Sequence, residues 1–373
     1  MYLEKELQEI VSIPSVSSNI RELNRCLDYC VNFATTNIDK SKIFINKKVF
    51  NDIPSILFSN CDTMQFDILA VGHVDVVPAK DELFKPKIIG TKLYGRGSAD
   101  MKNGVLVSLD ILKDVIKANK QVKYGVLVVC DEETGGNSGS REWAKLGLNG
   151  KILIDYDSGD GFEYISQRQK GSVWVEITTK GVDAHGSMPW NGIDSNDIMF
   201  SLIAELRKTF RAYSQLDKPN DTWVSTMHIG SIKGGEVVNK IASSTTAVID
   251  FRIIEKYTLK DVEKTLNTII EESKYKNYIS YKNLLYNKAV FSGINNKYFK
   301  NYSNLLEKEI GKKPTLTTFN GSTDMAVFVN ENNIVIHHNP NIGPIHSDNE
   351  FVDLATVEKL KKIGLQFVLE YTE

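Results

Sequence analysis

The sequence predicts an α/β protein with a mostly parallel sheet and helices on both faces, interrupted by a smaller α+β domain. Three observations carry this prediction. Short apolar runs alternate with helical apolar spacing in the first part of the chain, the succession that gives a parallel sheet. Apolar and polar residues alternate singly in the middle, as in strands buried on one face. From about Ala289 the first pattern returns, so the middle is an insertion.

The first part of the chain contains helical spacing before and between its apolar runs. Helices are expected at residues 3–11, 20–35 and 104–118. Strands are expected at residues 66–71, 124–130 and 152–154. Turn residues bound these runs, which is typical of strands buried on both faces.

The middle of the chain predicts four strands and two helices, and the last part resumes the α/β pattern. The inserted strands are expected at 173–179, 222–232, 245–253 and 278–285, with helices at 194–213 and 259–273. A helix at 296–310, a strand at 334–336 and a helix at 354–371 follow. We therefore expect a discontinuous catalytic domain, 1–172 and 288–373, and a lid or dimerisation domain with a four-stranded antiparallel sheet, 173–287.

Composition narrows the classes of partner. A chain of 373 residues is long enough for two domains. The net charge of −2 argues against a nucleic-acid surface, and no apolar run approaches the length of a membrane span. The charged start, with Glu4, Lys5 and Glu6, leaves no room for a secretory leader, and four scattered cysteines do not form a disulfide framework. These features predict a cytoplasmic protein acting on a small molecule.

Acids and histidines follow the predicted strands, at the edge where reactive groups of open α/β sheets collect. These clusters contain His73 and Asp75, Asp100, Glu132 and Glu133, Asp155 and Asp157, and His346. Imidazole and carboxylate ligands without cysteine fit a catalytic zinc-type site. Five such clusters offer too many ligands for one tetrahedral ion with an open position, whereas two ions that share a bridging carboxylate would use them all.

Three motifs in combination resemble the metallopeptidase family of acetylornithine deacetylase, succinyl-diaminopimelate desuccinylase, aminoacylase and carboxypeptidase G. The motifs are His73-Val74-Asp75, Tyr94-Gly95-Arg96-Gly97 through Asp100-Met101-Lys102, and Glu132-Glu133. The resemblance runs from the segment that starts at Ile13 to the segment that ends at Glu350.

The resemblance implies a dinuclear zinc centre in which cobalt or manganese can substitute. Asp100 falls on the position of the bridging ligand. His73 and Asp157 would then bind one ion, and Glu133 and His346 would bind the other.

The resemblance also implies roles for the two acids beside the ligands. Asp75 matches the carboxylate that orients the histidine ligand, here His73. Glu132 matches the general base, which takes a proton from metal-activated water and returns it to the departing amine.

The inserted domain carries further matches. His185 resembles the histidine that stabilises the oxyanion, often across a homodimer formed through the lid. Asn239 and Arg252 resemble residues that hold a substrate carboxylate. Gly321 and Ser322 resemble part of the glycine-rich substrate turn of the catalytic domain.

Two departures from the biosynthetic deacylases leave the substrate open. Desuccinylases usually have a glutamate followed by proline as the fourth ligand, whereas here Asp157 is preferred and Asp155 is the alternative. His337 and His338 also stand where small or acidic residues are usual, and substrate contact and packing at the strand end both account for them.

We therefore expect a hydrolase that cleaves an amide bond beside a free carboxylate, in a small peptide or an N-acyl amino acid. The alternatives are an N-acetyl or N-succinyl amino acid deacylase of arginine or lysine biosynthesis, a catalytically inactive ligand-binding relative, and a two-metal phosphoesterase.

Overall fold

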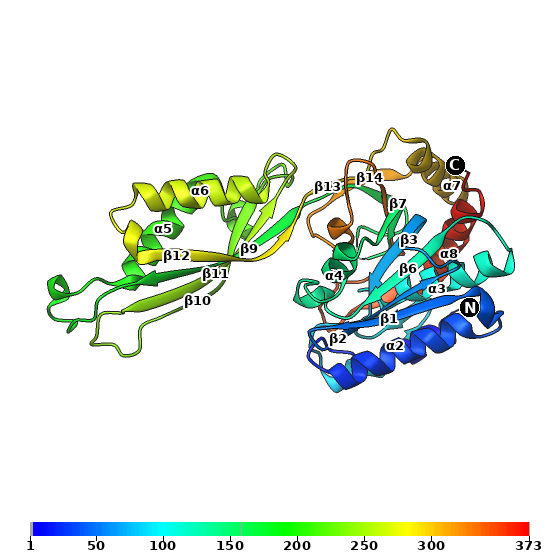
Figure 1. The fold of residues 1–373 in the computed structure, drawn as a ribbon, viewed down its shortest axis with the longest axis horizontal. Coiled ribbons are helices and arrows are strands. Elements are labelled where there is room, and N and C mark those ends of the chain that lie inside the picture. Colours follow the sequence, from blue (N-terminus) through cyan, green and yellow to red (C-terminus); the bar gives the residue numbers. More distant parts are fainter. Residues whose placement is uncertain (1–2, 158, 373) are drawn as a thin grey trace. The chain divides into compact units, whose positions relative to one another are not determined.

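Two separate β-sheets organise the chain in the computed structural model, which describes residues 3–157 and 159–372 (Figure 1). The first compact unit comprises Met1–Arg168, Phe291–Phe319 and Thr323–Glu373. The second comprises Gln169–Val290 and Asn320–Ser322. Within the described part of the chain, no helix combines the length and the apolar character needed to cross a bilayer.

The first unit is built on a nine-stranded sheet in the order β1-β2-β6-β3-β7-β15-β8-β13, with β14 paired to β8. The strands are β1 (Phe44–Phe50), β2 (Ile53–Ser59), β3 (Gln65–His73), β6 (Tyr124–Val129), β7 (Asn149–Asp155), β8 (Tyr164–Gln169), β13 (Val290–Phe291), β14 (Thr315–Phe319) and β15 (Ile334–His337). The neighbours β6, β3, β7 and β15 run parallel, whereas β1, β2 and β8 pair antiparallel. The predicted mostly parallel sheet is confirmed.

Both faces of this sheet are covered. The helices of the first unit are α1 (Glu4–Val11), α2 (Ile20–Thr35), α3 (Lys102–Lys117), α4 (Ser140–Lys145), α7 (Lys297–Ile310) and α8 (Leu354–Leu369). On β3, Ile68 and Ala70 join the main core, to which α1, α2, α3 and α8 contribute. Leu69 is buried on the opposite face, and the 3-10 helix Asp324–Val327 also contacts this strand. Helices on both faces were predicted from the sequence.

The hairpin β1–β2 was missed by the sequence analysis. Its two-residue turn holds Asn51 and Asp52 at φ 48° and 65°, the left-handed conformations that a tight type I′ hairpin needs. Lysines interrupt the largely exposed β1, so its apolar signal is weak. An Asn-Asp pair between two apolar runs was the available signal.

The second unit contains an antiparallel sheet in the order β10-β11-β9-β12, as predicted. Its elements are β9 (Gly171–Lys180), α5 (Ser195–Thr209), β10 (Thr226–Gly234), β11 (Ser244–Ile253), α6 (Leu259–Glu272) and β12 (Ile279–Asn287). Val175 and Ile249 alternate with less buried residues and pack with Leu206 of α5 and Leu266 of α6. One face of the sheet is therefore covered by helices.

A small third sheet, β16-β5-β4, joins two loops of the first unit. Its strands are β4 (Lys87–Ile89), β5 (Lys92–Tyr94) and β16 (Phe351–Asp353). Phe351 pairs with Tyr94, so the loop after β5, which carries Asp100, lies beside the loop before β16, which carries His346.

Candidate metal centre

Three parallel strands bring their polar ends to one edge of the main sheet. His73 is the last residue of β3, and the 3-10 helix Glu132–Thr134 follows β6. Asp157 lies just beyond Asp155, the end of β7. Because β3 is parallel to both β6 and β7, these carboxyl ends meet at one edge, as predicted.

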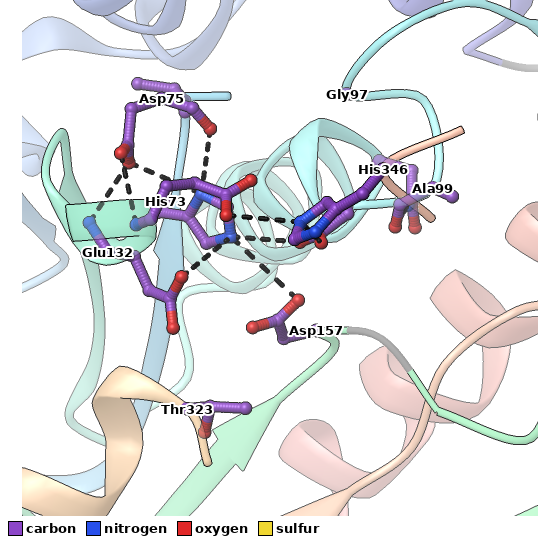
Figure 2. Close-up of polar contacts among 12 residues, drawn as sticks. His73, Asp75, Gly97, Ala99, Glu132, Asp157, Thr323 and His346 are labelled. Atoms are coloured by element: carbon purple, nitrogen blue, oxygen red, sulfur yellow. Dashed lines mark hydrogen bonds and ion pairs between the residues drawn. The ribbon is translucent and has the colours of Figure 1, made fainter. Parts of the chain in front are cut away.

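The carboxylate of Asp100 lies between two histidines. Its Oδ1 is 3.1 Å from His73 Nε2, and its Oδ2 is 3.2 Å from His346 Nε2. Asp157 Oδ1 is 3.9 Å from His73 Nε2, and Glu133 Oε2 is 3.2 Å from His346 Nε2. Figure 2 shows His73, Asp157 and His346 converging on this point. The five residues form two potential metal-binding groups with Asp100 in both.

Negative charge is concentrated in this buried cluster. Burial raises the pKa of Asp157, and the nearby carboxylate of Asp100 raises it further. Burial also raises the pKa of Glu132. Such a set of carboxylates is unfavourable away from water unless positive charge accompanies it.

The two histidines respond to the same charge. Burial alone would lower the pKa of His73, but hydrogen bonds with carboxylates, first that of Asp100, raise it. Hydrogen bonds with the carboxylates of Asp100 and Glu133 raise the pKa of His346 to about 10. Divalent cations meet the same demand for positive charge, and zinc-type ions accept imidazole and carboxylate ligands. The donor set therefore fits a metal centre.

Asp75 organises the segment that carries two other site residues. Its carboxylate accepts hydrogen bonds from the backbone amides of Glu132 and Glu133, each at 3.2 Å, and from Ser17 Oγ at 2.8 Å. His73 Nδ1 is closest to the backbone oxygen of Asp75, at 2.9 Å, and 3.4 Å from its carboxylate. Asp75 thus orients the histidine mainly through its main chain and uses its side chain to hold the next loop.

Glu132 lies beside the ligands and remains accessible. Its Oε2 is 3.9 Å from His73 Nε2, and its side chain is 18% exposed. A carboxylate in this position can reach both a solvent molecule and the metal-binding groups.

The two acids after β7 have different surroundings. Asp157 belongs to the group with His73 and Asp100. Asp155 Oδ1 instead accepts from the backbone amide of Asp157 at 2.9 Å, and its other oxygen accepts from Thr323 Oγ1. This arrangement favours Asp157 as the ligand and makes Asp155 its support.

His337 and His338 are both 1% exposed. His337 Nε2 donates to the backbone oxygen of Asp157 at 2.8 Å. His338 lies between the hydroxyl of Tyr302 and the carbonyl of Phe162, each at 2.8 Å. Of the two explanations offered by the sequence, packing at the strand end accounts for these contacts.

Sequence reasoning assigned no role to Glu350. Its buried carboxylate contacts Arg96 and accepts from backbone amides in the loop that carries Asp100. The only signal was its place at the end of the last polar cluster, because pairing between residues this distant in sequence has no local pattern.

The second unit brings the segment of His185, the predicted oxyanion residue, beside the segment of Asn239, a predicted substrate residue. The amide of Gly186 donates to the backbone oxygen of Asn239 at 2.8 Å. The backbones of His185 and Lys240 form an isolated antiparallel β-bridge. His185 is exposed, and its Nδ1 is 2.8 Å from Ser187 Oγ.

The other predicted substrate residues lie elsewhere. Arg252, on β11, pairs with Asp250, with its Nε and Nη2 atoms each 3.0 Å from Oδ2. Gly321 and Ser322 fall in the second compact unit. The turn they begin is split between the units, since Thr323 belongs to the first.

The sheet and the paired groups at its edge are those of a metal-dependent hydrolase. The chain belongs to peptidase family M20/M25/M40, whose sequence profile matches residues 69–370.

Relatives carry both deacylase and peptidase names. The chain is 25% identical to succinyl-diaminopimelate desuccinylase of Rickettsia bellii over 348 residues, which cover 87% of this chain and 86% of the relative. It is 25% identical to acetylornithine deacetylase of Buchnera aphidicola over 370 residues, 96% of this chain and 95% of the relative. An M20 family metallo-carboxypeptidase from Sulfolobus solfataricus shares the fold, with a TM-score of 0.80, 16% identity and 99% coverage of both chains.

Proposed function

We propose that the protein hydrolyses an amide bond beside a free carboxylate, in a small peptide or an N-acyl amino acid, with two zinc ions. The observation that carries this proposal is the position of Asp100, whose two oxygens each face a histidine of a different group. A carboxylate shared in this way suits a bridging ligand. Cobalt or manganese is expected to substitute for zinc.

Each ion would have its own ligands besides Asp100. His73 and Asp157 would hold one, and Glu133 and His346 the other. When bound, such ions polarise the substrate carbonyl and lower the pKa of water.

Glu132 moves the proton in this proposal. Its carboxylate takes a proton from the attacking water and delivers it to the departing nitrogen, so it serves first as base and then as acid. Its partial exposure and its distance of 3.9 Å from His73 support this role. Asp75 holds the backbone of Glu132 and so fixes the direction from which the carboxylate approaches.

The second unit supplies the substrate contacts that the resemblance implies. We infer that His185 stabilises the oxyanion, in one protomer or across a homodimer formed through this unit. Asn239 and Arg252 would hold the substrate carboxylate. Gly321 and Ser322 would belong to a turn that contacts the substrate. The contact between the His185 and Asn239 loops supports a joint role for these two residues.

The experiment is a hydrolysis assay of the purified protein loaded with zinc, cobalt or manganese, using dipeptides, tripeptides, N-acetyl and N-succinyl amino acids. Glu132→Gln should lower kcat by about 100- to 10,000-fold. Its metal content should stay at that of the wild type. The control is Glu142→Gln, because Glu142 is similarly exposed, at 24%, but pairs with Lys145 on α4.

The panel also separates the alternatives. Turnover of acyl amino acids alone would assign the deacylase function, and turnover of peptides alone the peptidase function. Full activity in Glu132→Gln would refute the role of that residue. Less than one bound ion per chain after careful loading would favour the inactive ligand-binding alternative.

A further inference from the structure

Two loops from distant parts of the chain must be held together to complete one of the metal-binding groups. One follows β5 and contains Asp100, and the other precedes β16 and contains His346. The pairing of β5 with β16 joins the bases of these loops, and the amide of Gly95 donates to the backbone oxygen of Glu350 at 3.1 Å. His346 itself adopts a positive φ of 58°, so its loop needs support from its surroundings.

The side chain of Glu350 provides a second and closer connection. It is 1% exposed, and its Oε1 accepts from the backbone amides of Gly97, Ala99 and Asp100 at 2.8, 3.1 and 3.3 Å. Its Oε2 forms an ion pair with the Arg96 guanidinium. One carboxylate therefore gathers donors along the loop that ends at Asp100.

The other metal-binding group is held by different means. His73 ends β3, and the backbone of Asp157 is bound by Asp155 and His337. These anchors belong to the main sheet. Displacing Glu350 should therefore disturb the group of Asp100, Glu133 and His346 more than the group of His73, Asp100 and Asp157.

We propose that Glu350 is a positioning residue that keeps the side chains of Asp100 and His346 at the spacing needed to bind the second ion. This inference rests on the proposed function. The carboxylate acts through the loop backbone and touches neither substrate nor metal. Its negative charge matters because three amide donors and a guanidinium converge on it, and all of them need an acceptor.

Glu350→Gln is the direct test. Glutamine keeps one oxygen acceptor but turns an NH2 donor toward Arg96, which has only donors of its own. The expected result is about a 10- to 100-fold weaker affinity for one of the two ions, the usual effect of losing a residue that supports a ligand. Zinc titration against a competing chelator measures this loss. The visible absorption of the cobalt-loaded protein should change as well, which a purely structural role would not predict.

Two further variants keep the result interpretable. Asp110→Asn is the matched control, because Asp110 is also a 1% exposed carboxylate paired with a cation, Lys361, at 3.3 Å. It should lower the stability of the apo protein but leave both metal affinities unchanged. The double variant Arg96→Met/Glu350→Gln removes both buried charges and the conflict between two donors, so it should fold even if Glu350→Gln does not. Because a neutral amide oxygen accepts more weakly than a carboxylate from the three loop amides, this variant should still show a selective, though smaller, loss of affinity for the same ion.

The outcomes separate this inference from the proposed function. Wild-type protein that binds two ions, beside a folded Glu350→Gln or double variant with unchanged affinities and cobalt spectrum, would overturn the role of Glu350 alone. Equal metal loss in Asp110→Asn would overturn it too, because the loss would then reflect stability. A wild-type protein that binds no metal would overturn the proposed function first.

Discussion

Replacing His338 with glutamine is expected to make the free energy of unfolding less sensitive to acid. The Phe162 carbonyl can only accept, so Nε2 of His338 carries the hydrogen and Nδ1 accepts from the Tyr302 hydroxyl. The neutral imidazole satisfies both contacts. Burial, with a smaller contribution from the neighbouring His337, lowers the pKa of His338 from the ordinary value of 6.5 to about 4.

The sign and size of the effect follow from these two pKa values. At pH values between these two pKa values, His338 is protonated in the unfolded chain but not in the folded protein. The free energy of unfolding therefore falls as the pH falls. The difference of 6.5 − 4 = 2.5 pKa units in His338 corresponds to about 3 kcal/mol in total. Between about pH 8 and about pH 5, roughly 2 kcal/mol of this should be lost.

Urea unfolding of the metal-free protein at these two pH values measures the effect. A chelator is present throughout, so that release of metal in acid does not contribute. His338→Gln should lose about 2 kcal/mol less than the wild type over the interval. Tyr302→Phe is the control: it keeps the buried imidazole and should lose about 1 kcal/mol at both pH values. Identical pH dependence in the wild type and His338→Gln would refute the reasoning.

Other perturbations address the metal centre. Asp157→Asn should leave one tightly bound ion where two are proposed, whereas Asp155→Asn should keep both with about 10-fold weaker affinity, as metal analysis after gel filtration can establish. Removing metal with a chelator should abolish hydrolysis and lower the unfolding free energy by about 3 kcal/mol for an ion present at about 100 times its Kd, with recovery on adding zinc. Ser17→Ala removes a hydrogen bond to Asp75 and should cost about 1 kcal/mol of stability while leaving the metal content unchanged, and thermal unfolding checks this.

The parts of the fold that the sequence predicts are those with a strong local signal. The buried runs of β3, β6 and β7 are nearly continuous in apolar residues, and their polar ends had to meet once the strands were parallel. This is why the sequence alone predicts that His73 and Asp157 lie at one edge of the sheet. The exposed, lysine-rich β1 lacks such a signal.

The parts that could not be predicted depend on side-chain direction and distant pairing. The i, i+2 spacing of His73 and Asp75 indicates neighbours, yet only the structure shows that the carboxylate turns toward the amides of Glu132 and Glu133. The contacts of Glu350 join segments 250 residues or more apart. No periodicity in the sequence reports such a contact.

Because the second unit is inserted into the sequence of the first, the residues of the metal-binding groups are synthesised in a fixed order. His73, Asp100 and Asp157 all emerge from the ribosome before the second unit begins, whereas His346 emerges after it. The strand β15, which lies between β7 and β8, is also translated late. Some 160 residues separate the end of β8 from the start of β15, and until β15 is made, β7 and β8 each lack one neighbouring strand. The nascent chain therefore contains the group of His73, Asp100 and Asp157 early, whereas the group of Asp100, Glu133 and His346 is complete only after β15 has been translated.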